Sequence, residues 1–204
     1  MTKQWKYAAT AVSCAFFWVG LAAFAAIPAP SSGSAKSTAK TKTTAVTMSD
    51  ADFAKAAAEG GIAEVKFGEL AEDKALSKTV KDLSQRMVDD HTKADDSLKT
   101  AASKDNISIP AQMNTKDQAA YARLSELSGA AFDRAYARDM VRDHEADIAA
   151  FRHEANDGKD ASIKSFAEQT LATLEDHLKM ARQALESVSS KTSAKTTKTI
   201  KKQY

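Results

Sequence analysis

The segment at residues 130–156, AAFDRAYARDMVRDHEADIAAFRHEAN, carries the strongest fold signal in the chain. Its large apolar side chains and one histidine recur at intervals of 4, 4, 4, 4 and 3 residues, at Phe132, Tyr136, Met140, His144, Ile148 and Phe151. Residues at this spacing share one face of an α-helix. The segment therefore predicts an amphipathic helix with one buried face, and Asp157 with Gly158 end it as a helix C-cap does.

Similar periodicity appears on both sides of this segment. It predicts three more long helices, at about residues 50–75, 78–103 and 161–187. Thr115 can cap a shorter helix that runs to about residue 127. Gly60 and Gly61 interrupt the first long helix, and either a kink or the close approach of another helix would explain them. Four amphipathic helices with mostly short connections predict an all-α, antiparallel four-helix bundle with a short extra helix before the third long helix.

The N-terminal residues have the layout of an export signal. Lys3 and Lys6 precede an uncharged stretch of 21 residues, 7–27, and small residues near its end suit a signal peptidase. Residues 1–30 therefore predict an export signal, and the domain is expected in the periplasm or cell envelope. A stretch of this length also suffices to span a bilayer, so an uncleaved anchor in the inner membrane is the alternative.

Lysine marks both ends of the chain. Residues 1–48 and 189–204 each hold five Lys and no acidic residue, so all 27 Asp and Glu lie between them, with 19 Lys and Arg. Residues 31–48 and 189–204 predict a flexible basic linker and a disordered basic tail around a bundle domain at 49–188. An acidic body argues against a nucleic-acid-binding domain. The basic ends suit anionic envelope surfaces, although Lys can also simply keep such segments soluble.

Three histidines lie on the predicted buried faces. His91, His144 and His177 each lie within about three residues of the midpoint of a different helix, which places them within about 5 Å of one level in the bundle. Glu64 lies near the midpoint of the remaining helix, at the edge of its apolar face. Three imidazoles and a carboxylate predict a site for zinc, copper, iron or manganese. The alternative is a set of hydrogen-bonded core histidines, and His153 is predicted at the surface.

A short motif ends at two of these histidines. Residues 87–91 read MVDDH and residues 140–144 read MVRDH. The Asp before each His is turned by about 100° around the helix, so we predict that it partners a histidine of the next helix. The Glu-x-x-His pairs of carboxylate-bridged di-iron bundles are absent, as are phosphate-loop and serine-hydrolase motifs. A metal-dependent redox enzyme is therefore disfavoured, and we predict no catalytic residue.

A larger set of residues along the predicted helices has a distinctive order and spacing: Phe53, residues 57–61, Glu64, Val65, Leu70, Ala71, residues 87–91, Phe132, Asp133, Tyr136, Met140, Val141, Asp143, His144, Phe151, Leu174, His177 and Leu178. In this order and spacing the chain resembles a bacterial family numbered 4142 among domains of unknown function, whose members are often labelled outer-membrane proteins. The resemblance covers about residues 48–187. It implies a ferritin-like helical bundle in an exported protein and implies no activity.

Two functions remain open from the sequence. The first is an exported envelope protein that binds a transition metal ion in the bundle core, with a role in metal handling or stress tolerance. The second is a structural or interaction module at the envelope, in which the histidines are core polar groups. In both, residues 7–27 would contact the membrane if they are not cleaved.

Overall fold

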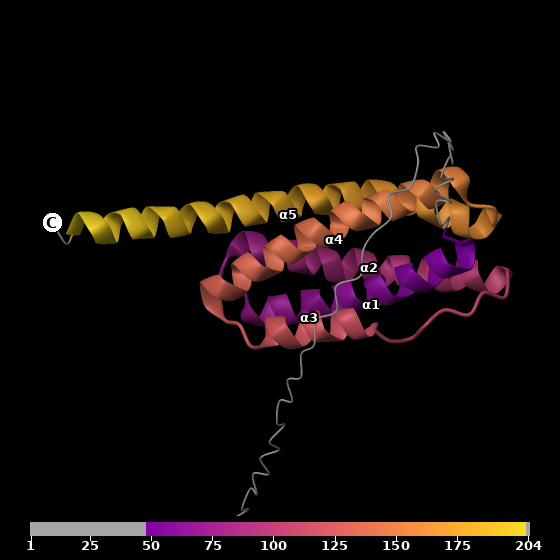
Figure 1. Cartoon of the computed structure of the whole chain (residues 1–204), viewed down its shortest axis with the longest axis horizontal. Helices are drawn as coiled ribbons and strands as arrows, with labels where there is room; N and C mark the ends of the chain where they lie inside the picture. Colours follow the sequence, from indigo (N-terminus) through magenta and orange to yellow (C-terminus); the bar gives the residue numbers. More distant parts are fainter. Residues whose placement is uncertain (1–47, 203–204) are drawn as a thin grey trace, which may run out of the picture. The chain divides into compact units, whose positions relative to one another are not determined.

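The computed structural model describes the backbone of residues 48–202 and the side chains of residues 48–190. Every regular element in this range is an α-helix, which confirms the predicted all-α class (Figure 1). The helices are α1 (Asp50–Lys74), α2 (Lys78–Lys104), α3 (Thr115–Ser125), α4 (Gly129–Asp157) and α5 (Ala161–Lys202). None of the described helices is long and apolar enough to cross a membrane. The predicted anchor at residues 7–27 lies outside the described residues.

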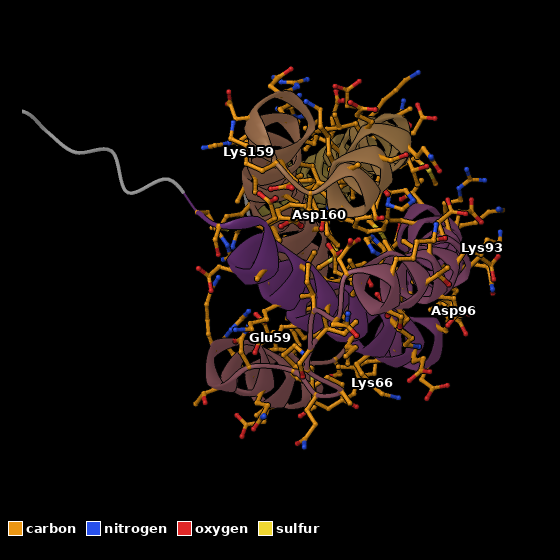
Figure 2. All side chains as sticks on the ribbon, turned by 90° about the vertical axis from the view of Figure 1, so that its right-hand side faces the viewer. Glu59, Lys66, Lys93, Asp96, Lys159 and Asp160 are labelled. Atoms are coloured by element: carbon orange, nitrogen blue, oxygen red, sulfur yellow. The ribbon has the colours of Figure 1, made fainter. Side chains whose placement is uncertain are left out.

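The four long helices pack around a common core. Turns of three residues join α1 to α2 and α4 to α5, so each pair forms a hairpin. The hairpins meet where α2 contacts α5 and α1 contacts α4, and α3 contacts α1 and α4. Figure 2 views the bundle from one end and shows charged side chains such as Lys93 and Asp96 pointing outward. The described part of the chain is therefore a helical bundle with a charged exterior.

The buried apolar side chains form two clusters, one towards each end of the bundle. One contains Phe67, Leu83, Met87, Phe132, Tyr136, Met140 and Ala181, among others. The other contains Phe53, Leu98, Ile148, Phe151, Ile163, Phe166 and Leu174, among others. The three stripe histidines fall between the two clusters along α2, α4 and α5. The core thus has a polar layer between two apolar layers, and this layer positions the candidate site.

Side-chain caps hold the first turns of α1 and α3. The Oγ of Ser49 accepts a hydrogen bond from the backbone N–H of Asp52 at 3.1 Å and donates to Oδ2 of Asp52 at 2.7 Å. The cap of α3 is Asn114, one residue earlier than predicted from Thr115. Its Oδ1 accepts from the N–H of Asp117 at 2.9 Å, because the amide oxygen of Asn reaches the first turn as well as a hydroxyl does.

The start of α2 is held by a side chain of another helix. Ser77 occupies the N-cap position but makes no capping hydrogen bond with its side chain. Instead the buried carboxylate of Asp133 accepts from the N–H of Leu76 at 3.0 Å and from the N–H of Ser77 at 2.9 Å. Asp133 therefore ties the turn between α1 and α2 to the first turn of α4.

Asp133→Ala is expected to lower the free energy of unfolding by about 2–4 kcal/mol, because it leaves two backbone N–H groups without an acceptor. Urea unfolding of the full chain measures the loss. The matched control is Asp82→Ala, which removes an exposed carboxylate paired with Lys78 on α2. A loss at Asp133 no larger than the loss at Asp82 would contradict the assignment.

The last helix is longer than its apolar stripe. The sequence predicted that it ends near residue 187 and that residues 189–204 form a disordered tail, whereas α5 continues to Lys202. Residues 188–202 contain no Gly or Pro, so nothing in that stretch stops a helix after the apolar stripe has ended. Figure 1 shows this end of α5 continuing past the other helices. The predicted linker and export segment precede the described residues, so their boundaries remain predictions.

Candidate metal centre

The structure brings the four residues predicted for a metal site together, one from each long helix. Glu64 comes from α1, His91 from α2, His144 from α4 and His177 from α5. Their exposed fractions are 4%, 5%, 0% and 0%. The ring centroids of the three histidines lie 5.1–5.7 Å apart, so the three rings are direct neighbours. His153 is half exposed near the end of α4, outside this group, as predicted.

Glu64 joins two of the histidines. Its Oε2 lies 2.9 Å from Nε2 of His91, and its Oε1 lies 3.2 Å from Nδ1 of His144. Neither His91 Nε2 nor Glu64 Oε1 has the geometry of a hydrogen bond to any described residue, and both atoms are buried. Buried polar atoms are rarely left in this state, because the cost of desolvating them is then uncompensated.

The hydrogen bonds behind two rings determine their protonation. Nδ1 of His144 lies 3.0 Å from the backbone oxygen of Met140, which can only accept, so Nδ1 carries the proton. Nε2 of His177 lies 3.1 Å from Oδ2 of Asp90, and an ionised carboxylate also only accepts. The neutral rings therefore present the lone pairs of His144 Nε2 and His177 Nδ1 to each other, across 3.3 Å.

Asp90 is the partner that orients His177. Arg86 on the same helix lies 2.5 Å from its Oδ2, and Lys93 lies 3.6 Å from its Oδ1. Partial burial disfavours the charge of Asp90, but the hydrogen bond from His177 and the charge of Arg86 together hold its pKa below the usual value. For Asp90 alone, the contact confirms the prediction that an Asp before a His partners a histidine of another helix. Asp143, the equivalent residue on α4, pairs with Arg142 instead.

Burial keeps the three imidazoles neutral. Desolvation lowers the pKa of His91 and of His177 to about 4, and it lowers the pKa of His144 as well. Desolvation also raises the pKa of Glu64 to about 7, against the attraction of His144. At neutral pH each imidazole thus has one nitrogen with a free lone pair. Protons would compete with a metal ion mainly at the carboxyl group of Glu64.

Two carboxyl groups that the sequence reading missed lie beside the site. Asp95 on α2 and Asp147 on α4 line the same cavity of about 80 Å³ as Glu64 and His91. Burial raises the pKa of Asp95 to about 6 and that of Asp147 to about 8. Each follows a stripe histidine by four or three residues, which puts it on the same helix face. This spacing after each histidine is the sequence signal for both, whereas the Glu-x-x-His motif concerns only residues before a histidine.

A glycine makes room for one of these carboxyl groups. A Cβ atom at Gly61 would lie 2.0 Å from Oδ1 of Asp95, whereas a Cβ atom at Gly60 would meet no atom within 4 Å. Helix α1 runs without interruption through both residues. Of the two explanations offered by the sequence, the close approach of another helix therefore accounts for Gly61.

A family model described as a domain of unknown function (DUF4142) matches residues 35–184, which include α1 to α4 and most of α5. No curated protein and no solved structure matches the chain. All four residues of the candidate centre lie within the matched range.

Proposed function

The chain belongs to the family described as a domain of unknown function, DUF4142, and we propose that it binds a transition metal ion between His91, His144, His177 and Glu64. The scaffold of this site is a ferritin-like, antiparallel four-helix bundle that supplies one ligand from each long helix. The protein would act in the periplasm or cell envelope, in metal handling or stress tolerance. Export by residues 1–30, and contact of the Lys-rich ends with anionic envelope surfaces, belong to the proposal and rest on the sequence alone.

The observation that carries the proposal is the pair of lone pairs on His144 Nε2 and His177 Nδ1. Two neutral rings that face each other in this way repel, because neither nitrogen can donate. A cation between them converts the repulsion into two bonds. Metal–nitrogen bonds of about 2.0–2.1 Å in a tetrahedral site separate two nitrogen ligands by about 3.3–3.4 Å. The observed separation of 3.3 Å matches that spacing.

His91 and Glu64 would provide the remaining ligands of the ion. His91 Nε2 offers a third neutral nitrogen, and the buried oxygens of Glu64 offer one negative charge towards a divalent ion. Outer partners already hold the rings, through the Met140 carbonyl on His144 and the carboxylate of Asp90 on His177. Such partners commonly orient metal-bound histidines and increase their basicity. Nitrogen-rich sites of this kind suit zinc, copper, iron or manganese.

We assign the methionines near the site to core packing rather than to metal binding. The side chains of Met87 and Met140 are fully buried in the apolar cluster next to the histidine layer. Met is a flexible residue that fills irregular gaps in a core. The proposal therefore includes only nitrogen and oxygen ligands.

Elemental analysis of the full chain, purified without a His tag, tests the proposal. We expect at least one transition metal ion per chain, and its loss in a His91→Ala/His144→Ala double variant. His153→Ala is the matched control, because this half-exposed histidine lies outside the group. Equal metal content in the wild type and the double variant would contradict the site. No bound metal after soaking with Zn, Cu, Mn and Fe salts would instead favour the structural or interaction module.

A further inference from the structure

The cavity beside the histidines has a charge character of its own. Carboxyl groups of three helices line it, from Glu64 on α1, Asp95 on α2 and Asp147 on α4. No Lys or Arg is among the described residues that line it. Arg86 and Lys93 pair with Asp90, which is not among the residues that line the cavity. The charged groups that line the cavity are therefore carboxyl groups, which attract a cation when they are ionised.

Glu64 contacts both the histidines and the cavity. Its Oε2 lies 2.9 Å from Nε2 of His91, and its Oε1 is buried and has no hydrogen-bond partner among the described residues. Glu64 also belongs to a second group, in which one ligand atom each of Glu64, His144 and Asp147 lie within 4.8 Å of one another. His144 is not available to a second ion, because its Nδ1 donates to the Met140 carbonyl and its Nε2 faces His177. The carboxylate oxygens of Glu64 and Asp147 remain as ligands.

We propose that the cavity holds a second divalent cation, bound by Glu64 and Asp147 with Asp95 at its wall, and that Glu64 bridges it to the ion at the histidines. The inference rests on the proposed function, because the bridge requires the first ion. Carboxylates that bridge two ions hold them about 3.5–4 Å apart, which a single Glu can span. An all-oxygen set suits hard cations, with Mn²⁺ a better match than Cu⁺.

The helix registers give this pair of sites a recognisable sequence pattern. Asp147 follows His144 by three residues and Asp95 follows His91 by four, so each helix presents its histidine one turn before a carboxyl group of the cavity. Carboxylate-bridged di-iron bundles use the reverse order, Glu-x-x-His. The absence of that motif therefore does not argue against two neighbouring ions in this bundle.

Gly61 is the second feature that serves the cavity. A side chain at this position would displace the Asp95 carboxylate, because its Cβ would lie 2.0 Å from Oδ1. Gly61→Ala should therefore weaken binding of the second ion about as much as Asp95→Ala does. Gly60→Ala changes the helix propensity of α1 by the same amount and meets no atom within 4 Å, so it serves as the matched control.

The test is the stoichiometry of Mn²⁺ on the full chain, by equilibrium dialysis and elemental analysis at about pH 8, where protons compete weakly for carboxylates. We expect two ions per wild-type chain and one per Asp147→Asn chain. Asp143→Asn should keep two ions, because it removes a nearby negative charge that pairs with Arg142 without touching the cavity. Electron paramagnetic resonance should show two exchange-coupled Mn²⁺ ions in the wild type and uncoupled Mn²⁺ in Asp147→Asn.

The outcomes separate the two proposals. One Mn²⁺ in the wild type that His177→Ala removes would overturn the second site and leave the histidine site standing. Two ions in both the wild type and Asp147→Asn would also overturn the second site. If the chain binds Zn²⁺ at its histidines but binds no Mn²⁺, the second site is overturned and the histidine site stands. Should Asp147→Asn fail to fold, Gly61→Ala against Gly60→Ala gives the same comparison without changing a charge.

Discussion

Replacing His177 with Ala is expected to weaken Zn²⁺ binding by more than about 100-fold, because removing a ligand costs more than the roughly 10–100-fold typical of an outer partner. His177 is fully buried, and its Nδ1 faces the nitrogen of His144 at 3.3 Å. A competition titration of the full chain against a chelator of known affinity measures the change. Unfolding in urea, followed without metal, shows how much stability the truncation itself removes.

Asp90→Ala should weaken binding by about 10–100-fold, because Asp90 orients His177 without touching the ion. Asp89→Ala is the matched control, since the neighbouring Asp89 is exposed on the same helix. The loss of Zn²⁺ affinity should be largest for His177→Ala, smaller for Asp90→Ala and smallest for Asp89→Ala. An Asp90→Ala loss equal to that of Asp89→Ala would show that the hydrogen bond does not support a metal ligand.

Raising the pH from about 6.5 to about 9 is expected to lower the free energy of unfolding of the metal-free protein. Burial raises the pKa of Glu64 to about 7 and that of Asp147 to about 8, well above the values of these groups in an unfolded chain. The folded state therefore holds protons that the unfolded state has lost. This contribution to stability is complete at acidic pH and disappears as the pH rises through the folded pKa values.

The histidines act in a different pH range. The pKa of His91 and of His177 is about 4 in the folded protein, below the value of about 6.5 in an unfolded chain. They therefore destabilise the fold only as the pH falls below about 6.5, where the unfolded state binds more protons. Above that value they are neutral in both states, so the carboxyl groups alone determine the slope.

Urea unfolding of metal-free protein at a series of pH values measures this slope. Each proton held only by the folded state contributes up to about 1.4 kcal/mol per pH unit. Asp147→Asn should flatten the decline, because the amide stays neutral at every pH. The exposed Asp96→Asn should leave it unchanged. A stability that rises between about pH 6.5 and 9 would contradict the direction given for both buried carboxyl groups.

The helices could be predicted because their signals are local. The spacing from Phe132 to Phe151 requires one buried helix face, and α4 has that face. The end of α5 could not be predicted in this way, because a stripe marks where burial stops rather than where a helix stops. The hydrogen bonds from the α1–α2 turn to Asp133 could not be predicted either. They join backbone N–H groups to a side chain that lies 56 and 57 residues away in the sequence.

Part of the candidate site could be predicted from the sequence, because the position of a residue along its helix is also a local signal. Counting residues from helix midpoints placed His91, His144 and His177 at one level, and the structure has their rings in contact distance. The protonation of His144 and His177 could not be predicted, because it depends on which atom each ring contacts on its outer side. The role of Gly61 could not be chosen from the sequence either, since only the position of Asp95 on the neighbouring helix distinguishes close approach from a kink.

The most direct test of the metal centre is a crystal structure of the Zn²⁺-soaked protein, with anomalous scattering recorded at the zinc edge. We expect an anomalous peak between His144 Nε2 and His177 Nδ1, at about 2.0–2.1 Å from each nitrogen, with His91 and Glu64 completing the coordination. A peak only at surface sites, or no peak while the two nitrogens keep their separation of 3.3 Å, would contradict the metal centre.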